Sequence, residues 1–114
     1  MPESFSVTSE TSDSEHRIAP SGELDIATVP VLEEAFDAAL ESGAPRIVVD
    51  LGQISFIDST GLRMLIRISE RAADGQLEIR STAVVDRLLQ VTGLLDQLPL
   101  APRDDGGAVA PPPS

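Results

Sequence analysis

The sequence contains no cysteine, lysine, tyrosine or tryptophan, and aromatic residues make up only 3% of it. The lack of cysteine excludes disulfide bonds, thiolate metal sites and cysteine catalysis, and it fits a reducing compartment. The lack of lysine excludes the glycine-rich phosphate loop that depends on one. Because aromatic side chains are scarce, the hydrophobic core must consist mainly of Leu, Ile, Val and Ala.

Basic residues are also few, since eight arginines stand against 19 acidic residues and the formal net charge is -11. A chain this acidic repels phosphate backbones and anionic lipid, so we expect no nucleic-acid partner, whereas a protein with a basic face is a suitable partner. No apolar run approaches the roughly 20 residues of a membrane span, and residues 1–10 lack the basic and apolar regions of a secretory signal. We therefore expect a cytoplasmic protein without membrane insertion.

With 114 residues, of which 41% are hydrophobic, the chain fits a single domain with its own core. Residues 1–14 are rich in Ser, Thr and acids, and we expect a flexible acidic segment that includes a short strand at 5–8. The folded domain is expected at 15–102. Residues 103–114 are rich in proline and glycine, which predicts a disordered tail.

Helices and strands are expected to alternate along the folded part. The first helix should begin after Thr28 as its N-cap and end near Gly43, with an acidic outer face. Strand–helix–strand crossovers imply parallel pairing. The sequence therefore predicts an α/β domain with a mixed, mostly parallel sheet of about four to five strands and helices packed mainly on one face. The remaining expected elements are strands at 17–19, 46–51 and 76–80, helices at 61–74 and 81–93, and a helical turn with a last edge strand after 94.

The second expected helix has one apolar and one charged face. Opposite charges three residues apart, in the pairs Arg67–Glu70 and Arg71–Asp74, predict two ion pairs within this helix. Met64 and Ile68 lie beside the apolar face, and they belong either to the core or to a partly exposed apolar patch. The apolar face itself contains Leu62, Leu65, Ile66 and Ser69.

Asp58, Ser59 and Thr60 stand between an apolar run that ends at Ile57 and the second helix. The Asp58 carboxylate can accept a hydrogen bond from an amide two or three residues on, which would stabilise the helix by about 0.5–2 kcal/mol. Helix capping alone accounts for an arbitrary Asp-Ser-Thr at such a junction. It leaves Ser59 pointing outward in the first turn, however, where a fixed, exposed hydroxyl suits a phosphoacceptor. Gly61 has no side chain, which lets another protein's backbone or a nucleotide approach closely.

Enzyme motifs built on these residues fail on spacing. A nucleophile elbow has glycine two residues before and after the serine, but Ile57 stands two before Ser59, and the only histidine, His16, lies upstream of the serine. An aspartic protease motif has glycine two residues after the aspartate, whereas Gly61 stands three after Asp58. His16 alone forms no metal site and is expected on a strand surface. We expect no catalytic residues, no metal and no cofactor.

Three segments resemble one protein family in the right order. The stretch VVDLGQISFIDSTGLRMLIRISERA resembles the bacterial anti-sigma-factor antagonists, which are stand-alone STAS domains. GELDIATVPVLEEAF is similar to the family's Gly-Glu-Leu-Asp segment leading into its first helix, and AVVDRLLQVTGLLDQL to its third helix and Thr-Gly-Leu terminus. Together the matches cover about residues 15 to 100.

The resemblance implies a partner switch centred on Ser59, which aligns with the serine that an anti-sigma factor with serine-kinase activity phosphorylates. The unphosphorylated antagonist binds the anti-sigma factor and frees the sigma factor, phosphorylation breaks the complex, and a Ser/Thr phosphatase resets it. Several members carry a small residue where this chain has Arg63. The alternative is a STAS scaffold subunit of a lipid-transport or stress-signalling complex whose serine is not a switch. The expected partner-binding residues are Asp58, Ser59, Thr60, Gly61, Leu62, Arg63 and Met64.

Overall fold

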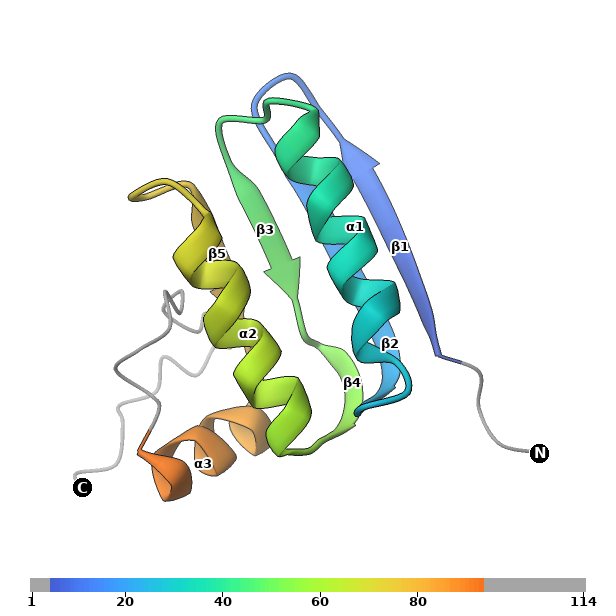
Figure 1. Cartoon of the computed structure of the whole chain (residues 1–114), viewed down its shortest axis with the longest axis vertical. Coiled ribbons are helices and arrows are strands. Elements are labelled where there is room, and N and C mark those ends of the chain that lie inside the picture. The colour runs from blue at the N-terminus through green and yellow to red at the C-terminus, as the bar shows by residue number, and fades with distance from the viewer. Residues whose placement is uncertain (1–4, 94–114) are drawn as a thin grey trace.

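A computed structural model describes residues 5–93, which form one sheet with three helices (Figure 1). The elements are β1 (Ser6–Thr11), β2 (His16–Leu24), α1 (Val29–Glu41), β3 (Ile47–Asp50), β4 (Gln53–Ile57), α2 (Ser59–Arg71), β5 (Leu77–Arg80) and α3 (Ala83–Thr92). After an initial hairpin, strands and helices alternate as the sequence predicts, except that β3 is followed directly by a second strand, β4, which was not expected. The helical turn and last strand expected after 94 lie outside the described residues.

The sheet is mixed and mostly parallel, which confirms the predicted fold class. Its strand order is β1-β2-β3-β5, with β4 also paired to β2, and only the β1–β2 pair is antiparallel. The first half of β2 pairs with β3 and its second half with β4, because Leu51 and Gly52 separate these two short strands. Strand β1 pairs along its whole length, so residues 6–11 belong to the sheet.

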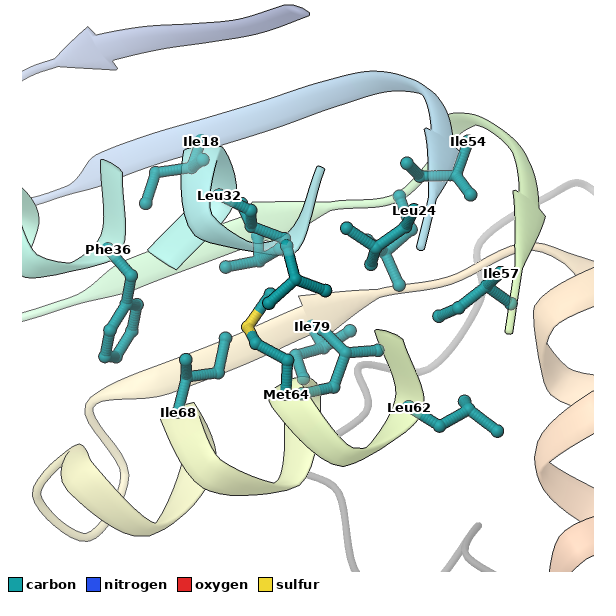
Figure 2. Packing of buried hydrophobic residues seen from close by; sticks show 14 of the residues in the cluster. Ile18, Leu24, Leu32, Phe36, Ile54, Ile57, Leu62, Met64, Ile68 and Ile79 are labelled. Carbon is teal, nitrogen blue, oxygen red and sulfur yellow. The ribbon is translucent and has the colours of Figure 1, made fainter. Parts of the chain in front are cut away.

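Helices α1 and α2 lie side by side on one face of the sheet (Figure 1). None of the helices within residues 5–93 is long and apolar enough to cross a membrane. The core lies between these helices and the strands (Figure 2). Met64 and Ile68 are both fully buried there, so the core alternative is correct and the exposed-patch alternative is wrong for both residues. Ile66 and Ser69, which we expected on the apolar face, are only half-buried.

Two arginines of α2 pair with acids of α1 rather than with acids of their own helix. Arg71 lies 2.6 Å from Asp37 and Arg67 lies 3.7 Å from Glu33. The expected pair of Arg71 with Asp74 is wrong because α2 ends at Arg71, so Asp74 is not on the helix. These contacts join the two helices that cover the sheet.

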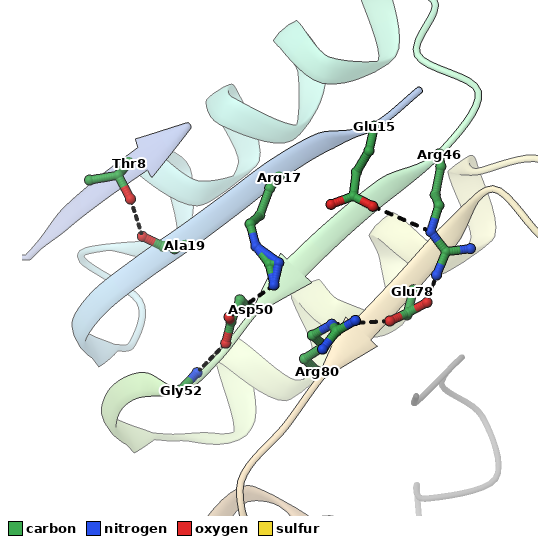
Figure 3. Close-up of polar contacts among 9 residues, drawn as sticks. All are labelled: Thr8, Glu15, Arg17, Ala19, Arg46, Asp50, Gly52, Glu78 and Arg80. Atoms are coloured by element: carbon green, nitrogen blue, oxygen red, sulfur yellow. Dashed lines mark hydrogen bonds and ion pairs between the residues drawn. The ribbon is translucent and has the colours of Figure 1, made fainter. Parts of the chain in front are cut away.

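The opposite face of the sheet carries a ladder of charged side chains (Figure 3). Arg17 of β2 contacts Asp50 of β3 at 3.7 Å, and Glu78 of β5 contacts both Arg46 and Arg80. Along β2, buried residues alternate with less buried ones, as expected for a strand with one covered face.

Candidate functional site

Asp58 joins β4 to α2 and fixes the start of the helix. Its Oδ1 accepts a hydrogen bond from the Gly61 amide at 2.9 Å, which is the capping interaction that the sequence predicts. Its own amide donates to the Leu24 carbonyl at 3.2 Å, so the junction is also tied to the end of β2. Because the Asp58 backbone is bonded to β2 and its side chain is bonded to α2, the first turn of α2 has little freedom to move.

Ser59 is the first residue of α2, and it is exposed. Its hydroxyl forms no hydrogen bond with any other residue in the described part of the chain, whereas the neighbouring Thr60 is half-buried. The local structure therefore presents the exposed Ser59 hydroxyl on a helix start that Asp58 fixes. That arrangement is what a phosphoacceptor requires.

Gly61 is buried, and its role differs from the one expected. A Cβ at this position would lie 2.8 Å from the Leu24 carbonyl oxygen and 2.8 Å from Cγ1 of Ile57. The absence of a side chain lets α2 pack closely on β2 and β4 of its own domain. Close approach of another protein at Gly61 is not supported, because the space beside it is already filled.

The rest of the predicted contact segment divides between core and surface. Leu62 is buried at the start of α2, and Met64 is fully buried, so the prediction that Met64 contacts a partner is wrong. Its thioether faces the core because α2 turns that side toward the sheet (Figure 2). Arg63 is exposed, and it makes no ion pair with the described residues.

His16 is buried, which contradicts the expected surface position. It begins β2 on the same face as Ile18 and Leu24, and its Nδ1 has no hydrogen-bond partner among the described residues. Because β2 runs from His16 to Leu24, the only histidine of the chain stands at the opposite end of the strand from the β4–α2 junction. Ser59 therefore has no histidine beside it to act as a base.

The loop between β2 and α1 lies at the same end of the domain as Ser59 (Figure 1). Thr28 stands at the N-cap of α1, but its side chain does not cap the helix as predicted. Instead, Asp25 Oδ1 accepts hydrogen bonds from the amides of Ala27 and Thr28, at 3.0 and 3.2 Å. The Thr28 hydroxyl in turn donates to the Glu23 carbonyl at 2.7 Å, so the loop is closed by its own polar groups.

Two exposed apolar residues at this end were not anticipated. Ile26 in the loop has 74% of its surface exposed and Phe56 of β4 has 50%. The sequence carries a signal for each, since Ile26 is an apolar residue within a polar loop and Phe56 alternates with the inward-facing Ile57.

Comparison with known proteins identifies the family. The family model described as "Mlab, STAS domain" matches residues 7–100. The anti-sigma-B factor antagonist of Staphylococcus aureus is 33% identical over 95 residues, which cover 81% of this chain and 88% of that protein.

Solved structures agree with this family. An anti-sigma factor antagonist from Mycobacterium paratuberculosis has a TM-score of 0.79 at 29% identity, covering 95% of this chain and 94% of that one. The phosphorylated form of the Bacillus cell fate determinant SpoIIAA shares the fold, with a TM-score of 0.62 at 19% identity over 93% of this chain and 96% of that one. The chain belongs to the STAS domain family and groups within it with the anti-sigma factor antagonists.

Proposed function

We propose that this protein is an anti-sigma factor antagonist that is switched by phosphorylation of Ser59. Its unphosphorylated form binds an anti-sigma factor with serine-kinase activity in the cytoplasm, and this binding releases the sigma factor. Phosphorylation of Ser59 abolishes the binding, and a Ser/Thr phosphatase restores it. The observation that supports this most strongly is the exposed hydroxyl of Ser59, which forms no hydrogen bond within the described part of the chain and stands on a capped helix start.

The position of Ser59 allows a phosphate without unfolding the domain. A phosphoryl group adds about -1.5 to -2 charges at neutral pH. The N-terminus of α2 tolerates that charge because the backbone amides and the helix dipole favour anions there. Since Asp58 already caps the helix through Gly61, the added group projects into solvent. Its effect therefore falls on the complex with a partner and not on the fold.

The same group disfavours a complex with a kinase. A kinase must bring the phosphates of its nucleotide close to Ser59, so a phosphate on the serine adds both bulk and like charge at the point of closest approach. Each loss of about 1.4 kcal/mol in binding free energy weakens the complex tenfold. A few such units are enough to release the partner.

The Asp58 carboxylate and the exposed Arg63 are the remaining polar groups that we assign to the contact surface. Asp58 is half-buried, and Arg63, one turn along α2, forms no ion pair with any residue that the structure describes. The net charge of -11 adds a general preference for partners with a basic face and against nucleic acid.

A second candidate is a STAS scaffold subunit of a lipid-transport or stress-signalling complex whose serine is not a switch. We keep it because the matching family model is described as Mlab rather than as an antagonist. Both candidates have the same fold, so the fold does not separate them, and phosphorylation of Ser59 does.

The test is to incubate the purified protein with ATP and each anti-sigma factor kinase of its source genome, followed by mass spectrometry. The switch predicts one phosphoryl group on Ser59, lost in Ser59→Ala and retained in Ser55→Ala, a matched control because Ser55 is also an exposed serine close to the junction. Absence of modification with every kinase favours the scaffold.

A further inference from the structure

We propose that Ile26 and Phe56 anchor the anti-sigma factor at the end of the domain that carries Ser59, and that the factor meets them with an apolar patch bordered by arginine or lysine. This inference rests on the proposed function and adds the chemistry of the partner's contact surface. We call Ile26, Phe56 and Ser59, with the acidic residues Glu23, Asp25 and Asp58, the end surface.

The exposed apolar residues of the domain concentrate at this end. Among the side chains that the structure describes, the large apolar ones that are exposed are Ile26, Val31, Phe56 and Val91. Val31 lies in the first turn of α1, directly after the loop that carries Ile26. Only Val91 belongs to another part of the molecule, toward the end of α3, which Figure 1 shows apart from the β2–α1 loop. Scattered exposed apolar residues need no explanation, but a group at the same end of the domain as Ser59 indicates a contact surface.

Ile26 is presented by a loop that is ordered by its own hydrogen bonds. The Asp25 carboxylate accepts hydrogen bonds from the consecutive amides of Ala27 and Thr28, and the Thr28 hydroxyl accepts one from the Asp25 amide at 2.9 Å. A side chain on a preorganised loop loses little conformational entropy when a partner covers it. Ile26 therefore suits an anchor better than an apolar residue on a free loop.

Phe56 faces the side of the sheet that α1 and α2 leave open. It pairs with Glu23 across β2 and β4, while the next pair, Leu24 and Ile57, is buried on the helix side. Phe56 and Glu23 therefore share one face at the strand ends, three residues before Ser59. Aromatic side chains carry much of the energy in protein interfaces because they bury a large apolar area.

The charges at this end select the partner. Glu23 is exposed beside Phe56, and the carboxylates of Asp25 and Asp58 follow at the ends of β2 and β4. A second copy of this chain would bring acids against acids, whereas a partner with arginine or lysine around an apolar centre would meet both features. We therefore assign the surface to a different protein and not to self-association.

The test measures the affinity of the anti-sigma factor kinase that phosphorylates Ser59 for five unphosphorylated proteins: wild type, Ile26→Ser, Phe56→Ser, Glu23→Arg and Val91→Ser. Val91 is the matched control because it is as exposed as Ile26, at 78% against 74%. We expect Ile26→Ser and Phe56→Ser each to weaken binding at least tenfold, equivalent to about 1.4 kcal/mol, while Val91→Ser matches wild type. Glu23→Arg should also weaken binding relative to wild type, and the wild-type affinity should fall as salt increases.

Circular dichroism melting curves must show that each variant folds. If Phe56→Ser does not fold, Ile26→Ser alone tests the proposal, because Ile26 lies in an exposed loop. Equal affinities for wild type and both anchor variants would overturn the anchor proposal, while phosphorylation of Ser59 would still support the proposed function. A wild-type dimer in sedimentation that Phe56→Ser dissociates would assign the surface to self-association and also overturn it. If no kinase of the genome binds or modifies the wild type, both proposals fall.

Discussion

At the scale of single residues, Gly61 and Asp58 fix the geometry that exposes Ser59. Gly61 brings α2 against the Leu24 carbonyl, and Asp58 caps the same turn of helix. Neither residue needs to touch a partner to matter for the site. Substitutions at Gly61 and Asp58 can test the close packing and the helix cap separately from partner binding.

Replacing Gly61 with alanine should destabilise the domain, although the same change in an ordinary helix stabilises by about 1 kcal/mol. The new Cβ would lie 2.8 Å from the Leu24 carbonyl oxygen, a backbone atom that cannot move without shifting β2. We expect a loss of about 1–3 kcal/mol in the free energy of unfolding, measured in urea. Thr60→Ala, one residue earlier in the helix, is the control and should change stability little. A more stable Gly61→Ala would contradict the close packing.

Asp58→Ala removes the cap and should cost about 0.5–2 kcal/mol of stability. Asp58→Asn keeps an oxygen for the Gly61 amide and loses the charge, so its stability should stay within a few tenths of a kcal/mol of wild type. If Asn at 58 destabilises as much as Ala does, the cap seen between Asp58 and Gly61 is not what holds the helix start. If Asp58→Asn is as stable as wild type, any loss of partner binding in this variant is due to the missing carboxylate charge.

At the scale of elements, the sequence predicts helices better than strands. Periodic apolar residues and flanking glycines locate α1 and α3 well. Strand β4 was missed because Gln53 and Ser55 are polar and only Ile54 and Ile57 of this strand face the core. His16 was misplaced because a histidine in a short polar stretch carries no sign of the covered face, which only the register with Ile47 reveals.

The α1–α2 contact rests partly on Arg71, which pairs with Asp37 and lies over the Phe36 ring at 5.5 Å. Both partners of the ion pair are more than a third exposed, so solvent screens their attraction, and we expect a coupling of about 0.2–1 kcal/mol. A double-mutant cycle of Arg71→Met and Asp37→Asn, measured by urea unfolding, should show this coupling shrink at high salt. A coupling that ignores salt would contradict the ionic contribution.

At the scale of the whole molecule, topology determines the site. Parallel pairing of β2 with β4 brings the β2–α1 loop and the start of α2 to the same end of the sheet, where Asp58 bonds to Leu24. The motif Asp58–Ser59 was visible in the sequence, and so was its capping role. The position of Ile26 near this motif was not visible, because it depends on pairing between segments that are distant along the chain, and the exposure of Phe56 was not recognised because strand β4 was missed.

Ser59→Asp should leave the domain folded, because an acid in the first turn of α2 interacts favourably with the helix dipole, by about 0.3–1 kcal/mol. Its melting temperature should equal or slightly exceed that of wild type, and its affinity for the anti-sigma factor should fall. Ser55→Asp serves as the control for added charge nearby. A domain that unfolds in Ser59→Asp would show that modification acts on the fold rather than on the complex.

The most direct measurement compares the affinity of the anti-sigma factor for the unmodified protein and for the same protein fully phosphorylated on Ser59, by titration calorimetry. The account predicts tight binding by the unmodified form and a loss of at least a hundredfold, about 2.7 kcal/mol, on phosphorylation. Both forms should give the same circular dichroism spectrum. Equal affinity of the two forms would contradict it.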